Sequence, residues 1–441
     1  MKNTKRILLT ALLLLTVFIL GSCGSAAGES GGGYGGGYGT GDSMDAAPGA
    51  PEGGADDGYY GGESDMPAEG SGESGSDADS GDGSSNTNRL PAGQMTASAW
   101  NDNDNYSFWQ ETLISKFSSQ TNRYDRWQFD TSTRIKVTVK NGDAPLSGVK
   151  LEAKSAEGDV VAKAITNSSG VAYFFSLGEG SITASVGEAT LAEQYNSETT
   201  EISLDLAVEN PKLEIIDLML VVDVTGSMGD ELRYLSSELQ NVVETVAAKH
   251  QNATINLALL FYRDNGDSEK FSYHDFLDVT DPANLKAQID AIGNQYASGG
   301  GDYPEAVDEA LELAVSKQWS TGASTKIIFF VLDAPPHDND YEINERYRAA
   351  TMKAEELGIR ICPIICSGAD LLTEYLMRQT AITTGGTFIF ITDHSGIGGS
   401  HHDPSLPNTT VEALNALMIR LIDGYYTGVF QPPVPYNAPA T

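Results

Sequence analysis

Short apolar runs alternate with segments of helical periodicity between residues 211 and 428. The runs are apolar at nearly every position, as is typical of parallel strands buried on both faces, and the alternation places helices on both sides of the sheet. We therefore predict a doubly wound, mostly parallel α/β sheet, with one antiparallel edge strand that begins at Phe271 after a hairpin. The expected strands are EIIDLMLVVD, INLALLFYR, KIIFFVLD, IRICPII and TFIFIT, and the helices are expected to begin at Gly229, Pro282, Pro304, Ile343, Ala369 and Thr409.

Residues 132–210 change to a period of two, with turn residues between the alternating stretches. This pattern predicts a small all-β sandwich that precedes the α/β domain. Residues 90–131 carry aromatic side chains, among them Trp109, that a folded surface would bury. The DNDN stretch in this segment lacks the glycine and the glutamate of an EF-hand loop, so it predicts a helix start capped by Asn105 or Ser107.

The chain begins with residues that have the pattern of a targeting signal. Lysines and an arginine precede an apolar core that is too short to span a membrane, so residues 1–22 are read as a signal peptide. The sequence Leu20-Gly21-Ser22-Cys23 resembles a bacterial lipobox, which implies that lipid is attached to Cys23 and anchors an exported protein to the cell membrane. The alternative is an ordinary secretory signal in which the cysteine stands by chance.

Composition separates the next segment from the folded part. Residues 23–89 are rich in glycine, serine and acidic residues, which predicts a disordered acidic tether, and residues 429–441 form a proline-rich tail. The whole chain of 441 residues has a net charge of −34 with only 27 Lys and Arg. A nucleic-acid partner is excluded because phosphate binding needs a basic surface.

Two cysteines follow Cys23, at positions 362 and 366. Four residues apart on a strand they lie about 13 Å apart, which is too far for a disulfide. We interpret them as buried thiols, with a redox or metal-binding CxxxC pair as the alternative. His337 is interpreted as a polar loop residue, with zinc ligation as the alternative, and the pair His401-His402 as exposed loop residues, with loose metal binding as the alternative.

Oxygen-bearing side chains follow the ends of the predicted strands. Asp223 ends the first core strand, Thr225 and Ser227 lie in the loop after it, and Asp333 ends another apolar strand. Ligands gather at the carboxyl ends of the strands of such sheets, and hydroxyl and carboxylate oxygens suit Mg²⁺. Asp302 follows three glycines that let the backbone approach closely. The sequence therefore predicts a site for one Mg²⁺ or Mn²⁺ ion.

Residues 211–428 resemble a von Willebrand factor type A (VWA) domain, and Asp223-Val224-Thr225-Gly226-Ser227 resembles its metal-ion-dependent adhesion site. The resemblance implies that Thr225 and Ser227 bind the metal directly and that Asp223 and Asp333 act through water. It also implies a threonine from a middle loop, which this chain lacks, and Asp302 is the candidate in its place. The alternative is a scaffold without metal, in which the two hydroxyls cap the next helix.

Residues 132–210, with the stretches APLSGVKLEA and TNSSGVAYFFSL, resemble the carboxypeptidase-regulatory-like β-sandwiches of secreted bacterial proteins, which are mostly spacers. The tether and the sandwich would then hold the VWA domain away from the membrane.

These resemblances imply a protein-binding function at the cell surface. In the VWA family an Asp or Glu of the partner commonly completes the metal coordination, so we expect a metal-dependent adhesion or protein-interaction lipoprotein that faces outside the cytoplasm. Outside the glycine-rich tether the sequence has no GxSxG or HExxH motif, and we expect no catalytic activity. The alternatives are a non-catalytic component of an envelope assembly or stress-sensing complex, and a metal-assisted hydrolase.

Overall fold

The computed structural model describes residues 90–118 and 124–437, which belong to one compact unit. The predicted signal peptide, the lipidation site at Cys23, the acidic tether and the end of the proline-rich tail lie outside the described residues. Within the described ranges, no helix is both long enough and apolar enough to cross a membrane.

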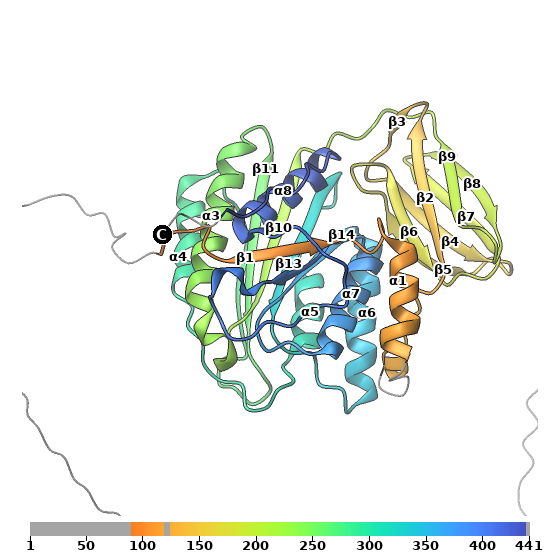
Figure 1. Ribbon diagram of the computed structural model, residues 1–441. Helices are drawn as coiled ribbons and strands as arrows, with labels where there is room; N and C mark the ends of the chain where they lie inside the picture. The colour runs from red at the N-terminus through yellow and green to blue at the C-terminus, as the bar shows by residue number, and fades with distance from the viewer. Residues whose placement is uncertain (1–89, 119–123, 438–441) are drawn as a thin grey trace, which may run out of the picture. The chain divides into compact units, whose positions relative to one another are not determined.

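One eight-stranded sheet forms the centre of the α/β domain (Figure 1). Its strands are, in spatial order, β12 (Phe271–Asp278), β11 (Thr254–Tyr262), β10 (Ile215–Asp223), β13 (Ser324–Leu332), β14 (Ile359–Ile365), β15 (Phe388–Ile391), β1 (Thr96–Trp100) and β16 (Glu412–Ala413). The strands from β11 to β15 run parallel, and β12 pairs antiparallel with β11 at one edge. The predicted mostly parallel α/β sheet is confirmed, including its antiparallel strand from Phe271.

Helices cover both faces of the sheet because the strands are apolar on both faces. One core packs against α3 (Leu232–Lys249), α4 (Pro282–Gly293) and α8 (Leu414–Thr427). The other core packs against α5 (Val307–Val315), α6 (Tyr341–Leu357) and α7 (Leu371–Thr384). Four of these helices begin two to five residues later than the sequence predicts, since α3, α5, α7 and α8 start at Leu232, Val307, Leu371 and Leu414, and α6 begins two residues earlier, at Tyr341.

The segment before the small β-sheets also belongs to the α/β domain. β1 pairs antiparallel with β15, with Ala97 opposite Ile391, and extends the large sheet beyond its last parallel strand. After β1 come α1 (Tyr106–Thr112) and the π-helical turn η1 (Leu113–Phe117), whose side chains join the core under α6 and α7. Sequence analysis set residues 90–131 apart from the α/β domain, because one short strand with small residues carries little hydrophobic signal.

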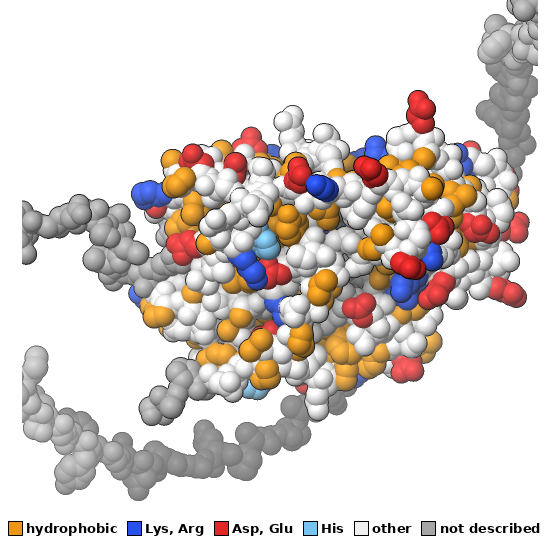
Figure 2. Space-filling view, turned by 90° about the horizontal axis from the view of Figure 1, so that it is seen from above, with side chains coloured by type: hydrophobic (Ala, Val, Ile, Leu, Met, Phe, Trp, Pro, Cys, Tyr) orange, Lys and Arg blue, Asp and Glu red, His pale blue; other side chains and the backbone are white. Residues whose placement is uncertain are grey.

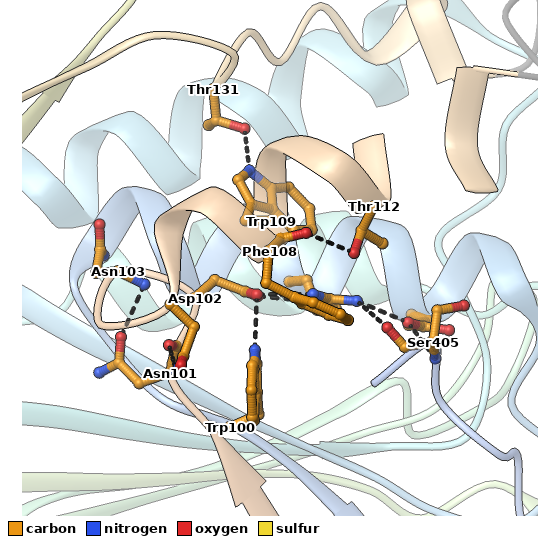
Figure 3. Close-up of polar contacts among 12 residues, drawn as sticks. Trp100, Asn101, Asp102, Asn103, Phe108, Trp109, Thr112, Thr131 and Ser405 are labelled. Carbon is orange, nitrogen blue, oxygen red and sulfur yellow. Dashed lines mark hydrogen bonds and ion pairs between the residues drawn. The ribbon is translucent and has the colours of Figure 1, made fainter. Parts of the chain in front are cut away.

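The DNDN stretch has a structural role that differs from the predicted helix cap. Asn105 occupies the N-cap position of α1, but its side-chain amide donates to the Asn101 carbonyl at 2.9 Å and accepts no bond from the helix. Asp102 is buried and forms two hydrogen bonds with Arg378 of α7, from Nε at 2.9 Å and from Nη2 at 2.6 Å (Figure 3). Arg378 also donates to Glu374 at 3.0 Å and to the Ser405 carbonyl at 3.3 Å. This paired network joins the N-terminal segment to α7 and to the loop before α8.

Residues 134–205 form two smaller four-stranded sheets that share one apolar core. The first contains β2 (Arg134–Asn141), β3 (Ala144–Pro145), β6 (Val171–Phe175) and β9 (Glu201–Asp205), and the second contains β4 (Lys150–Ser155), β5 (Val160–Ile165), β7 (Gly180–Val186) and β8 (Ala189–Tyr195). Sequence analysis did not identify β8. This edge strand is exposed on both faces up to Tyr195, so it has no alternation of apolar and polar residues to detect.

Candidate functional site

The carboxyl ends of three neighbouring strands bring acidic side chains together. Asp223 is the last residue of β10, Asp264 follows β11, and Asp333 follows β13. The parallel register pairs Asp223 with Tyr262 and Val222 with Val331, so these strands end side by side. Asp223 is fully buried and Asp333 is 3% exposed. The edge of the sheet therefore holds buried carboxyl groups of like charge, as the sequence predicted for two of them.

The loop after β10 folds its hydroxyl groups onto Asp223. The Thr225 backbone N–H donates to Asp223 Oδ1 at 2.8 Å, and the Thr225 hydroxyl donates to the same oxygen at 2.7 Å. Thr225 Oγ1 lies 3.1 Å from Ser227 Oγ. Ser227 is exposed in a 3₁₀ turn, Gly226–Asp230. Thr225 occupies the N-cap position of this turn, but its side chain forms no capping hydrogen bond. The three predicted residues thus form one contiguous set of oxygens.

The glycine loop before α5 lies directly against this set. The Gly226 N–H donates to the Gly299 carbonyl at 3.0 Å, and the Gly300 N–H donates to Asp267 at 2.9 Å. Gly299 and Gly300 have φ values of +77° and +71°, and a Cβ on Gly300 would lie 2.9 Å from Glu305 Oε1. Only glycine permits this backbone conformation and this approach, which explains the need for the glycine run.

Glu305 is, with Asp264, a buried carboxyl group of this site that the sequence did not single out. It is 3% exposed, and its N–H donates to the Pro335 carbonyl at 3.0 Å, which joins the loop before α5 to the loop after β13. Asp302, the predicted ligand, is exposed and lines the same cavity. The one sequence signal for Glu305 is its position next to Pro304, where the pattern predicts the start of a helix and no metal ligand.

The electrostatics of this set favour a bound cation. Burial, with Asp333 nearby, raises the pKa of Asp223 to about 7 even though Thr225 donates to it. Burial, together with Asp223, Asp264, Asp333 and Asp267, raises the pKa of Glu305 to about 9. Asp223 Oδ2 and Glu305 Oε2 are buried without a hydrogen-bond partner. A buried carboxylate oxygen without a partner is costly, and a divalent cation would relieve both the missing bonds and the repulsion.

A cavity of about 500 Å³ opens over these groups. Its lining contains Ser227, Asp302, Tyr303, Glu305 and Asp333, together with small residues of the glycine loop and of the loop after β15, and no Lys or Arg. Its lining therefore makes the cavity acidic in character. The face of the molecule seen from above in Figure 2 also has dispersed acidic side chains and no broad basic patch.

The oxygen donors fit a hard divalent metal ion, provided that the hydroxyls take part. No group of three His, Cys, Asp or Glu side chains in the described part of the chain is placed to hold a metal. Thr225 and Ser227 would have to supply ligands beside Asp223 and Asp333, which is a combination suited to Mg²⁺ or Mn²⁺. The unpartnered oxygens of Asp223 and Glu305 lie in the same set.

The remaining candidates have structural partners. His337 Nε2 lies 2.8 Å from Asp264 Oδ1. The prediction that His401-His402 is an exposed pair is wrong, because the His401 side chain is 3% exposed and lies 2.9 Å from Glu231 and 2.6 Å from Asp393. His402 lies 2.8 Å from Glu374, so acidic partners draw this loop onto the domain. Cys362 and Cys366 are free and buried, which confirms the interpretation as buried thiols.

Comparison with known proteins assigns a domain type to this region. Residues 217–392 match the family model of the von Willebrand factor A domain. An ariadne-like RING finger protein of Acanthamoeba polyphaga mimivirus is 34% identical over 28% of this chain and 11% of its own length. The alpha-protein kinase vwkA of Dictyostelium discoideum is 29% identical over 29% of this chain and 20% of its own length. The chain thus spans a small part of these relatives.

Among solved structures, the pilus adhesin SpaC of Lactobacillus rhamnosus GG is similar to this chain in two crystal structures. One has a TM-score of 0.34 at 10% identity and covers 50% of this chain and 32% of the adhesin. The other, in an open conformation, has a TM-score of 0.33 at 11% identity, with 50% and 30% covered.

Proposed function

We propose, from the von Willebrand factor A domain at residues 217–392, that this protein binds a partner protein through a divalent metal ion. The observation that carries the proposal is the pair of buried carboxyl oxygens of Asp223 and Glu305 that have no hydrogen-bond partner, at a ligand-sized cavity. A structural carboxyl group at such a position would have hydrogen-bond donors on both oxygens. The arrangement instead supports a cation as the missing partner.

Each residue of the set has a role in this proposal. The hydroxyls of Thr225 and Ser227 and the carboxylates of Asp223 and Asp333 would hold one Mg²⁺ or Mn²⁺. Asp302 and Glu305 come from the neighbouring loop, and Glu305, being the buried one, is the stronger candidate for the middle-loop position. A bound Mg²⁺ would offer an exchangeable position to an oxygen ligand.

The partner is proposed to present an Asp or Glu carboxylate to that position. Tyr303, which lines the cavity and is 42% exposed, offers an aromatic surface at its rim, and aromatic residues are enriched among the strong contacts of interfaces. The interaction is therefore binding, with no catalytic step.

The proposed location follows from the amino-terminal sequence. A lipid on Cys23 would anchor the exported protein to the cell membrane, where it would act in adhesion or protein interaction. We expect Cys23→Ala to move the protein from the membrane fraction to the soluble fraction in a fractionation of the producing cells. Membrane retention of this variant without a partner would contradict the lipid anchor.

Calorimetric titration with MgCl₂ and MnCl₂ tests the metal site directly. We expect one ion per chain for the wild type and none for Asp223→Ala, with the wild-type affinity for Asp290→Ala, a control on the exposed face of α4. Asp302→Thr should keep the metal and leave the site more positive. Equal affinity of the wild type and Asp223→Ala would contradict the site, and no binding by the wild type would contradict the metal.

A second experiment separates metal binding from partner binding. Envelope proteins captured on the wild type with Mg²⁺ should be released by EDTA and should not bind Asp223→Ala. A partner retained equally in EDTA would instead indicate an assembly component that does not use the metal.

A further inference from the structure

A second cavity, of about 210 Å³, lies at the opposite end of the large sheet. Lys326 near the start of β13 and Arg360 near the start of β14 line one wall. The small β-sheets supply the facing wall, including Lys150 of β4. Hydrogen bonds connect the small sheets to the α/β domain beside this cavity. Arg360 Nη2 donates to the Ile165 carbonyl at 2.8 Å, and Ser169 Oγ donates to the Gly428 carbonyl at 3.3 Å.

The charged residues that line this cavity are all basic: Lys150, Lys326 and Arg360. Lys326 and Arg360 are 8% and 7% exposed, so both cations are largely removed from water. Basic residues are scarce in this chain, with 27 Lys and Arg against 61 Asp and Glu. This cavity nevertheless has three basic side chains and no acidic side chain in its lining. The uncompensated positive charge therefore calls for an explanation.

Main-chain carbonyls satisfy only part of the hydrogen-bonding capacity of the two buried cations. Lys326 Nζ donates to the Leu357 carbonyl at 3.1 Å, and Arg360 Nη1 donates to the Thr384 carbonyl at 2.9 Å. Leu357 and Thr384 are the last residues of α6 and α7, so both cations also interact favourably with helix C-termini. Lysine has three donors and arginine has five, which leaves donors for a further acceptor.

The nearby carboxyl groups do not take that role. Asp217, opposite Lys326 in the sheet, already accepts hydrogen bonds from Asn256 and from both the N–H and the hydroxyl of Ser320. Burial raises the pKa of Glu355, beside Arg360, well above its usual range, and Arg360 offsets this only in part. Burial, partly offset by Asp217, lowers the pKa of Lys326, and Arg360 and Lys150 lower it further.

We infer that this cavity binds a small polyvalent oxyanion of the sulfate or phosphate class. Such an anion accepts several hydrogen bonds at once, matches the arginine fork, and removes the repulsion among three cations. Because Lys150 comes from the small sheets and the other two cations come from the α/β domain, a bound anion would also fasten the two parts of the described chain together. This inference does not depend on the proposed metal site.

The competing explanation assigns the two buried cations to helix capping alone and fills the cavity with water, which occupies about 30 Å³ per molecule in the liquid. That explanation predicts no stoichiometric sulfate binding, and the general stabilisation by sulfate, which is excluded from protein surfaces, should then be equal in the wild type and in Lys150→Met.

Titration of the full-length chain with sodium sulfate in a chloride buffer of constant ionic strength separates the two explanations. We expect one sulfate per chain and a melting temperature that rises with sulfate concentration, because a ligand that binds only the folded state stabilises it. Phosphate should act like sulfate, and acetate should be weaker by about tenfold or more. Equal effects of sulfate and chloride would overturn the inference, and acetate binding as tightly as sulfate would overturn the anion class.

Two variants tie the binding to the cavity. Lys150→Met changes an exposed side chain, so it should fold normally and weaken sulfate binding by about tenfold. Lys326→Met should weaken it more, with its fold checked by circular dichroism. Lys286→Met, on an exposed α4 side chain that is 67% accessible, is the control with unchanged affinity. Wild-type sulfate affinity in Lys150→Met would overturn the site.

Discussion

Two groups of buried charges in the α/β domain have opposite designs. In the first group, Arg378, Asp102 and Glu374 have side chains that are at most 1% exposed, and each charge faces a partner of opposite sign. Arg378 also lies over the Trp109 ring, 4.8 Å from its centroid, which shields the network from water. In the second group, Asp223, Glu305 and Asp333 are all acidic, and oxygens of Asp223 and Glu305 have no hydrogen-bond partner.

The difference indicates which buried charges hold the fold and which are kept for a ligand. A paired network contributes specificity to the packing and is strongly destabilising when one partner is removed. A like-charged group lowers stability on its own, since each carboxylate raises the cost of ionising the next. Natural structures retain such strain where a function needs it. The two groups should therefore respond to substitution in opposite directions.

The largest effect is expected in the paired network. Asp102→Ala leaves Arg378 buried with only Glu374 as a charged partner, and breaking a buried pair costs about 3–5 kcal/mol. Urea unfolding followed by tryptophan fluorescence measures the loss. Asp104→Ala, in the same turn but exposed, should unfold like the wild type. A loss below about 1 kcal/mol in Asp102→Ala would show that the network does not hold the segment.

Asp223→Asn should have the opposite sign in metal-free protein. The pKa of Asp223 is about 7 in the folded chain against 3.8 for a free carboxyl, which bounds the gain at about 4 kcal/mol above pH 7. The substituted amide can still accept from Thr225, but its N–H donors are buried without a partner, which takes back about 1–3 kcal/mol and leaves an expected net gain of about 1–3 kcal/mol.

The pH dependence of this gain identifies its cause. The folded state binds more protons than the unfolded state between pH 4 and pH 7, so the wild type loses stability across that range as pH rises. Urea midpoints of the wild type and Asp223→Asn should therefore cross without metal: the variant should be lower near pH 4 by the cost of its amide and higher at pH 8. Destabilisation of Asp223→Asn at pH 8 would contradict the strain in this group.

A third effect, of about 1 kcal/mol, is expected at His401, which ties the loop after β15 to Glu231. Burial lowers the pKa of His401, but the hydrogen bonds to Glu231 and Asp393 outweigh it and raise the pKa above 6.5. This contribution is fully present below pH 6.5 and is lost as pH rises through the raised pKa. The melting temperatures of the wild type and His401→Gln should differ at pH 5.5 and converge at pH 9, while exposed His394→Gln should match the wild type at both.

The smallest change in stability is expected at Asp302, which is exposed. Asp302→Asn should unfold within about 0.5 kcal/mol of the wild type, as is usual for surface substitutions. The same variant compared with Glu305→Gln distinguishes the two candidates for the middle-loop ligand. We expect Glu305→Gln to weaken Mg²⁺ binding in calorimetry more than Asp302→Asn does, and the reverse order would restore Asp302 as the ligand.

The sequence predicts most of the large sheet, because each parallel strand is buried on both faces and is therefore apolar at nearly every position. It missed β1 and β8 for opposite reasons. β1 is a short strand of small residues whose partner lies almost three hundred positions along the chain, while β8 is exposed along most of its length.

The candidate site was predictable to the extent that strand ends determine it. Asp223, Thr225, Ser227 and Asp333 stand at strand ends, and the structure brings them to one edge. Glu305 depends on the course of an irregular loop, which is set by the approach of Gly300 and the bond to Pro335, and no periodic pattern reports that. The sequence does not predict the ion pair between Asp102 and Arg378, because local patterns carry no information on contacts between residues far apart in the chain.

The position of β1 also has a mechanical consequence. The chain passes through β1 before it forms the small sheets, and β1 is bonded along its length to β15. Tension applied at the amino-terminal end and resisted at the edge of the sheet that carries Asp223 would therefore enter the large sheet through β1 and its hydrogen bonds to β15. The two small sheets, inserted between β1 and β10, would stay outside the line of force and would work as a side branch instead of a load-bearing stalk.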